Sequence, residues 1–344
     1  MAYLTDTVLT EYRQKYDESK LDAHDHRLSN YGILAAFQDD TPNLIQASAL
    51  EENRTSEDRA TKIPVIKRKD FSGTRATTRS CTAIENYNTS ALVTASWTTY
   101  ANGFHMIPSQ YKNNDIGYMA DFTRKMNDLQ RDALVFLDGL SYTKLNTDKS
   151  VVNNAEDNPY ALDSDTMTIP NADKSLLFNE LEQIMKQNDL PADRIVASPR
   201  FNALVNELSN QGVSNEKNYA FQFGGYNLYY SNRVTVDALY RDTFFVMPNG
   251  SMGFMTWVDP DSKANETSLS GKEWRKVNMP LLGFDVGLLH QDACADNSTE
   301  IGGGAEASKT EYFSFSFDYS FLTAYNSDSA TLPGSIFKGR IMST

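Results

Sequence analysis

The chain has 344 residues, of which 40% are hydrophobic and 22% charged, and its formal net charge is −13. This composition supports a packed core and excludes a globally disordered chain. The acidic balance disfavours a broad nucleic-acid-binding face, because such faces need clustered Lys and Arg.

The N-terminal stretch, MAYLTDTVLTEYRQKYDESK, has neither a basic start nor an apolar run. It therefore predicts no secretory signal. No window of the sequence approaches the roughly 20 apolar residues of a membrane helix. We expect a soluble protein made in a cytoplasm, with no membrane partner. Its two cysteines, Cys81 and Cys294, are expected to be free thiols, since they lie far apart in a long chain.

Residues 1–30 are polar and charged, with apolar side chains every fourth residue. This spacing predicts a short amphipathic helix. Its apolar stripe, made of Leu4, Val8, Tyr12 and Tyr16, is too narrow to stand alone. We therefore expect an arm that lies on another part of the structure. Apolar patches follow at 31–37 and 44–50.

The stretch IPVIKRKDFSGTRATTR, residues 63–79, predicts two short strands around a Ser72-Gly73 turn. Ile63, Val65 and Ile66 favour the first strand, and threonines between 74 and 82 favour the returning one. The hairpin has too little apolar surface to dock firmly on its own core. Five basic residues oppose a single acid, Asp70: Lys67, Arg68, Lys69, Arg75 and Arg79.

The segment 115–145 predicts one long amphipathic helix, because its apolar residues recur three and four apart. Those residues are Met119, Phe122, Met126, Leu129, Ala133, Phe136 and Leu140. Three heptads would also suit a coiled coil. The bulky phenylalanines and Ala133 favour a helix that packs on a sheet.

An α/β region is predicted from about residue 169. Leu177, Leu181, Ile184 and Met185 indicate a helix, and 194–197 a short strand, followed by a helix that Ser198-Pro199 would cap. Aromatic strands come next, and Asn249-Gly250 predicts a hairpin turn between two of them. A strand is expected at 281–290 and a loop at 295–309. The last strand, EYFSFSFDYSF, alternates polar and aromatic residues and is expected to be half-buried.

The search for chemistry yields no catalytic, cofactor or metal site. His24 and His26 lie in the polar arm without a third ligand nearby. The segment 259–265 resembles a calcium loop, but it has Ala264 where glycine is required and Ser270 where glutamate is required. No phosphate-binding loop or nucleophile elbow is present. We therefore expect a protein that is not an enzyme and needs no cofactor.

The order of these parts resembles the Hong Kong 97-type major capsid protein of tailed double-stranded-DNA bacteriophages. IPVIKRKDFSGTRATTRSC is similar to the extended loop of that family, and DIGYMADFTRKMNDLQRDALVFLDGL to its spine helix. DRIVASPRFNALVNEL, GGYNLYYSNRV and VMPNGSMGF are together similar to its axial domain. The resemblance covers about residues 30–325.

The resemblance implies an α+β fold of the Hong Kong 97 kind. Its parts would be an N-terminal arm, an extended β-hairpin loop, a peripheral domain that contains the spine helix, an α/β axial domain, and a return to the peripheral domain with a C-terminal tail. The corresponding ranges are 1–52, 53–102, 103–168, 169–294 and 295–344.

The resemblance also implies self-assembly into hexamers and pentamers of an icosahedral shell that encloses viral DNA. Portal, scaffolding, decoration or head–tail connector proteins are further partners that it implies, and packaged DNA would be held without sequence-specific binding. The protein would then be found in the virion after synthesis in the bacterial cytoplasm. The basic hairpin would lie on a neighbouring acidic copy. The expected interface residues are Lys67, Arg68, Lys69, Arg75 and Arg79 against Asp39, Asp40, Glu51 and Glu52.

Two alternatives remain open at the level of the sequence. One is an encapsulin-like cellular shell protein of the same fold, which would hold a cargo enzyme. The other, from a different class, is an uncharacterised hydrolase or carbohydrate-binding protein, which would be a monomer with a ligand cleft.

Overall fold

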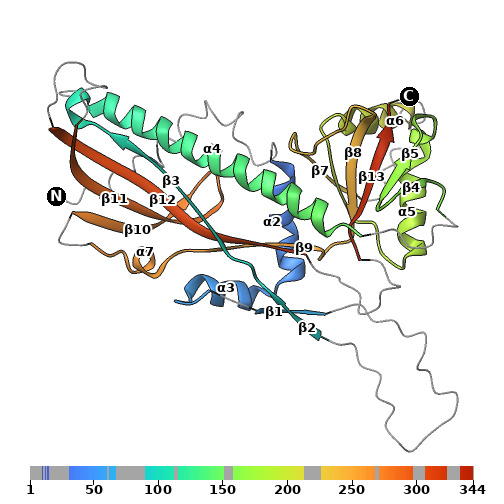
Figure 1. Cartoon of the computed structure of the whole chain (residues 1–344), viewed down its shortest axis with the longest axis horizontal. Helices are drawn as coiled ribbons and strands as arrows, with labels where there is room; N and C mark the ends of the chain where they lie inside the picture. The colour runs from blue at the N-terminus through green and yellow to red at the C-terminus, as the bar shows by residue number, and fades with distance from the viewer. Residues whose placement is uncertain are drawn as a thin grey trace, which may run out of the picture.

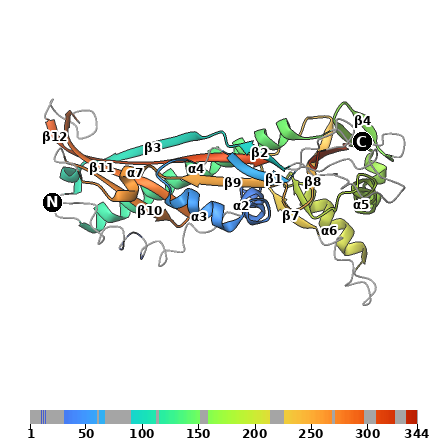
Figure 2. The same cartoon turned by 90° about the horizontal axis from the view of Figure 1, so that it is seen from below.

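The computed structural model describes residues 10, 12, 14, 31–59, 62–66, 90–111, 115–150, 158–212, 226–267, 271–296, 307–323 and 334–343. The fold is α+β, as predicted, with two larger sheets side by side and one long helix that runs along the first sheet toward the second (Figure 1). The molecule is broad in Figure 1 and thin in Figure 2, so it is a flat plate.

The first sheet has the strand order β10-β11-β12-β3, and β9 also pairs with β12. All of these pairings are antiparallel. The predicted alternation in EYFSFSFDYSF is confirmed from Tyr312, which is 41% exposed, to the buried Phe317, but it ends at Asp318, which is 8% exposed. The strands are β3 (Thr98–Met106), β9 (Met252–Trp257), β10 (Lys272–Met279), β11 (Phe284–Asp296) and β12 (Ala307–Thr323).

The long helix, α4 (Asp115–Asp148), confirms the strongest sequence prediction. It packs on β3 and β12 instead of forming a coiled coil. The predicted seam holds from Met119 to Ala133. The prediction that Phe136 belongs to the buried seam is wrong, because Phe136 is 41% exposed while Leu137 is fully buried. The 3.6-residue period turns Leu137 inward and leaves Phe136 at the helix edge.

The N-terminal arm prediction can be followed only at residues 10, 12 and 14, which are helical. Tyr12 is 2% exposed, and its ring meets that of Phe122 at 6.2 Å. Its hydroxyl donates to Asn127 Oδ1 at 2.8 Å. The arm therefore lies on α4 at this point. Leu4, Val8, Tyr16, His24 and His26 lie outside the described residues.

The second sheet has the order β4-β5-β13-β8-β6-β7, with helices packed on it. All four apolar residues predicted for the first of these helices are buried. The next helix begins at Phe201, three residues after Ser198. The Ser198 hydroxyl donates to Asp242 Oδ1 at 3.2 Å, and its carbonyl accepts from the Phe201 amide at 3.0 Å. The elements are β4 (Ala161–Asp163), β5 (Thr166–Ile169), η3 (Asn171–Leu176), α5 (Leu177–Gln187), β6 (Arg194–Ala197), α6 (Phe201–Gly212), β7 (Asn227–Tyr230), β8 (Tyr240–Met247) and β13 (Phe337–Met342).

Asn249-Gly250 forms a turn, and Gly250 has a φ of +79°. The strands on its two sides do not pair, however, because β8 belongs to the second sheet and β9 to the first. The prediction of a hairpin is therefore wrong. The turn is the crossover between the sheets, and its backbone amides are held by side chains from other elements.

Sheet membership also crosses the consecutive ranges inferred from the sequence. Strands β9 and β10 and most of β11 lie within 169–294 yet belong to the first sheet, whereas β13 lies within 295–344 and belongs to the second. The alternation within a strand shows which face is buried, but it does not reveal the partner strand. Grouping neighbouring segments consequently separates strands that pair over long distances.

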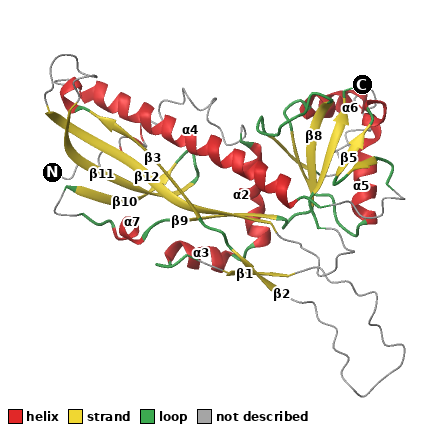
Figure 3. Cartoon of the chain, in the orientation of Figure 1, coloured by secondary structure: helices red, strands yellow, loops and turns green. Residues whose placement is uncertain are grey.

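Three shorter helices complete the described fold (Figure 3): α2 (Gly32–Leu44), α3 (Ala47–Thr55) and α7 (Pro260–Ala264), with a 3-10 turn, η2 (Pro108–Tyr111). Helix α2 stands between the sheets and contacts α4, β7 and β9. Among the described residues no helix is long and apolar enough to cross a bilayer.

Candidate functional site

The first strand of the predicted basic hairpin is present, but the strand that pairs with it lies later in the sequence than expected. Strand β1 (Lys62–Ile66) pairs antiparallel with β2 (Ser90–Thr94), with Ile66 opposite Ser90. The described partner of the first strand is therefore 90–94, and the returning strand predicted at 74–82 lies outside the described part of the chain. So do Lys67, Arg68, Lys69, Arg75 and Arg79. The β1–β2 ribbon leaves the body at its lower edge in Figure 1.

The returning strand enters the body through a small apolar cluster. Ala95, directly after β2, is 8% exposed and packs with Ile45, Met255 and Leu322. Three residues later, Thr98 pairs with Tyr319 in the first sheet. The ribbon is thus tied to the body at its root, where helix α3 and strands β9 and β12 come together.

Three of the four predicted acidic interface residues lie on the surface. Asp39, Glu51 and Glu52 are exposed. Asp39 accepts a hydrogen bond from the Tyr229 hydroxyl at 2.8 Å, and Glu51 lies 4.0 Å from Arg54 Nη1. These contacts leave both carboxylates accessible to a partner.

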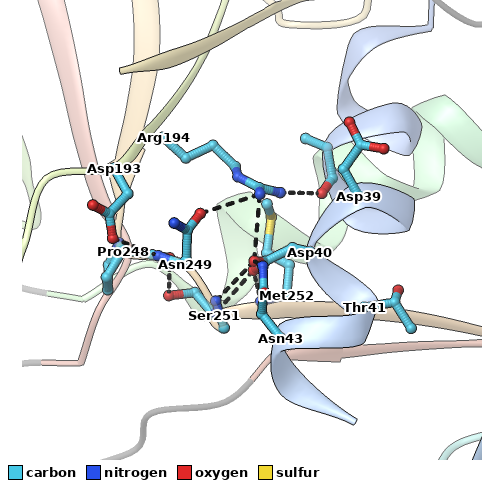
Figure 4. A network of polar contacts seen from close by, with 12 residues as sticks. Asp39, Asp40, Thr41, Asn43, Asp193, Arg194, Pro248, Asn249, Ser251 and Met252 are labelled. Atoms are coloured by element: carbon cyan, nitrogen blue, oxygen red, sulfur yellow. Dashed lines mark hydrogen bonds and ion pairs between the residues drawn. The ribbon is translucent and has the colours of Figure 1, made fainter. Parts of the chain in front are cut away.

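The prediction that Asp40 lies at an interface between copies is wrong, because its side chain is fully buried. Its Oδ1 accepts from the Gly250 amide at 2.7 Å, and its Oδ2 accepts from the amides of Ser251 and Met252 at 2.9 and 2.8 Å (Figure 4). The carboxylate therefore holds the crossover between the sheets and cannot meet a neighbouring copy.

Arg194, at the start of β6, completes this junction and is 2% exposed. Its Nη1 donates to the Ala36 carbonyl at 2.5 Å, and its Nη2 donates to Asn249 Oδ1 at 3.2 Å. The same Nη2 lies 3.5 Å from Asp40 Oδ1. One buried ion pair thereby links α2, the second sheet and the crossover (Figure 4).

A second buried carboxylate fixes the other end of α2. Asp138 of α4 accepts from the amides of Ile33 and Leu34 at 3.1 and 3.0 Å, which satisfies donors in the first turn of α2. Its other oxygen accepts from the Ser231 hydroxyl. Burial raises the pKa of the Asp138 carboxyl above its ordinary value, although these hydrogen bonds oppose that rise.

The sequence placed Asp40 on the surface and did not single out Asp138. Asp40 follows Asp39 in a polar-looking run, and Asp138 lies among the charges of a long helix. The one available signal was Arg194, a charged residue at the head of a strand whose other residues are apolar. It marks a buried charge that needs a partner, but it does not identify that partner.

The surface shows shallow grooves and no built catalytic centre among the described residues. One groove of about 330 Å³ lies between β3 and α4, and is lined by Phe104, Lys125, Asp128 and Asp132 among others. No group of three metal-ligating side chains occurs in the described part of the chain. The calcium-like segment forms α7 instead, where Asp259 Oδ1 accepts from the Ser262 amide at 2.8 Å.

No protein-family model matches the chain, and no curated protein matches it significantly. Similar solved structures include one from Mycobacterium phage Bobi, with 10% identity and a TM-score of 0.43 over 86% of this chain and 89% of the other. Another is from Microbacterium phage Oxtober96, with 14% identity and a TM-score of 0.40 over 84% and 87%. A holo-SrpI encapsulin complex from Synechococcus elongatus matches with 12% identity and a TM-score of 0.30 over 75% and 77%. Likenesses this distant assign no role to the chain or to any of its residues.

Proposed function

We propose that the chain is a major capsid protein of the Hong Kong 97 type, which self-assembles into the icosahedral shell around the double-stranded DNA of a tailed phage. The observation that carries this proposal is the β1–β2 ribbon, a separate two-stranded sheet at the lower edge of the body in Figure 1. An isolated two-stranded hairpin is marginal in water. A neighbouring copy supplies the surface that it needs.

In this proposal each described element takes a role in the shell. Helix α4 is the spine helix, and the first sheet belongs to the peripheral domain. The second sheet, with α5 and α6, forms the axial domain, and residues 1–52 form the arm. Hexamers and pentamers make the shell, with portal, scaffolding and decoration proteins as further partners. The net charge of −13 suits a container that does not bind its packaged DNA tightly.

The first test is self-assembly of the purified chain. We expect sedimentation velocity to show large particles besides subunits or small oligomers. Electron microscopy should show closed shells of uniform wall thickness. A compact monomer under all salt and crowding conditions, with the hairpin resistant to protease in that monomer, would contradict the proposal.

The second test concerns the charged contact. Reversing Lys67, Arg68 and Lys69 to Glu should leave the subunit folded by circular dichroism and should impair shell formation, because like charges would then meet Asp39, Glu51 and Glu52 of a neighbour. The wild-type contact should also weaken with salt, because the Debye length falls from about 10 Å at 0.1 M to about 3 Å at 1 M.

Two outcomes would count against this interface. An unfolded triple variant would place the hairpin in the subunit's own core. Normal shells at normal yield would make the basic run a solvated face. Asp173 and Glu180, which lie in the second sheet's domain, offer a matched control: reversing them to Lys should leave assembly unchanged in yield.

A further inference from the structure

Asp318 lies at the point where three strands of the first sheet meet. In β12 it is opposite Thr99 of β3 on one side and Trp257 of β9 on the other. Its side chain is 10% exposed, and Thr99 Oγ1 donates to its Oδ1 at 2.5 Å. One carboxylate oxygen is therefore engaged within the sheet, and the other remains for a different partner.

That partner is Arg59, which precedes strand β1 by three residues. Arg59 Nη1 lies 3.0 Å from Asp318 Oδ2. The guanidinium carbon also lies 5.5 Å from the centroid of the Trp257 ring. Arg59 thus contacts two residues that are paired on the adjacent strands β12 and β9. It does so at the place where the chain leaves the body for the ribbon.

The backbone just before Arg59 is held at the same place. The Ser56 carbonyl accepts from Lys263 Nζ at 2.5 Å and from Trp257 Nε1 at 3.2 Å. Lys263 Nζ lies 4.6 Å from the centroid of the Trp257 ring, so this ring meets a cation from α7 as well as Arg59. The segment 56–59 is consequently anchored at both of its ends.

These contacts orient the segment 56–59 and contribute little to the stability of the core. The Arg59 side chain is 44% exposed, and an ion pair that exposed contributes little to folding. A small change at the root is amplified along the ribbon, however. At 3.3 Å per residue, β1 extends about 16 Å, so a 10° rotation at its root moves its far end by about 3 Å.

We propose that Arg59, held by Asp318 and Trp257, is a positioning residue that sets the angle between the β1–β2 ribbon and the first sheet, and thereby the curvature of the assembly. The link to curvature rests on the proposed function, because the ribbon meets its neighbour only in a shell. The angle itself is a property of the single subunit.

The test compares Arg59→Ala with two matched variants. Arg59→Lys keeps the charge that Asp318 needs. Thr99→Ala removes a hydrogen bond to the same carboxylate but leaves the tie to the ribbon. Spin labels at Ser90 in β2 and Thr143 in α4, in a Cys81→Ser, Cys294→Ser background, report the angle as a distance distribution by double electron–electron resonance.

We expect Arg59→Ala to keep the wild-type unfolding temperature and to broaden the distance distribution. In electron micrographs it should lower the share of particles with the wild-type diameter about threefold, since an exposed pair of this kind controls a conformer ratio of that order. Arg59→Lys should recover most of both properties, and Thr99→Ala should match the wild type.

Two results would overturn the proposal. One is an Arg59→Ala variant with the wild-type distance distribution. The other is the same broadening in Thr99→Ala, which would place the effect in the sheet itself. If the wild type forms no particles, the shell function fails, while the distance measurement still decides whether Arg59 sets the angle. If Arg59→Ala does not fold, Trp257→Phe, which loses the Nε1 hydrogen bond to Ser56 and reduces the ring surface that Arg59 and Lys263 meet, should broaden the distribution.

Discussion

Replacing Phe122 by alanine should lower the free energy of unfolding of the subunit by about 3–5 kcal/mol. Phe122 lies on the face of α4 that packs on the first sheet, and it is fully buried. Its ring centroid lies 5.0 Å from that of Phe313 and 5.7 Å from that of Phe104. Alanine would remove these contacts and leave a cavity that a helix fixed at many other points cannot close.

The matched control is Phe136→Ala on the same helix. Phe136 is 41% exposed, so less of its surface is buried than that of Phe122, and its loss should cost less than about 1 kcal/mol. Chemical denaturation of both variants, monitored by circular dichroism, measures the two losses. Equal losses for the two residues would mean that α4 presents a different face to the sheet.

Replacing Asp40 by alanine should destabilise the subunit by about 3–5 kcal/mol, as expected when one partner of a buried ion pair is removed. Three backbone amides of the crossover would lose their acceptor, and Arg194, which is 2% exposed, would lose its ion-pair partner. Because the same carboxylate joins α2 to both sheets, the loss should also separate the unfolding of the two sheets.

Asp39→Ala provides the control at the adjacent position. Asp39 is exposed and accepts one hydrogen bond, from Tyr229, so its loss should cost less than about 1 kcal/mol. Differential scanning calorimetry should give one transition for the wild type and Asp39→Ala. Asp40→Ala should give two transitions, or one at a much lower temperature. An Asp40→Ala variant as stable as the wild type would mean that the crossover does not depend on this carboxylate.

The elements with a strong period were predictable from the sequence. Helix α4 and strand β12 each bury one face, and apolar residues recur along that face at regular spacing in the sequence. The type of each element is therefore predicted correctly even though Phe136 is placed on the wrong face. The same local patterns carry no information about partners. Asn249-Gly250 is a turn in both the prediction and the structure, yet the strands beside it join different sheets.

The junction residues were harder to predict for a related reason. Asp40 and Asp39 are chemically identical neighbours, and only the helical rotation of about 100° between them buries one and exposes the other. Arg59 and Asp318 are separated by most of the chain and meet because three strands converge at Asp318. Sites of this kind depend on tertiary pairing, which hydrophobic periodicity does not encode.

Electron cryomicroscopy of the purified full-length chain tests the shell function most directly. We expect closed icosahedral particles in which the β1–β2 ribbon of each copy lies on the surface of a neighbour, with Asp39, Glu51 and Glu52 near its basic residues. A monomeric or small-oligomeric protein under every assembly condition, or particles in which the ribbon folds back on its own subunit, would contradict it.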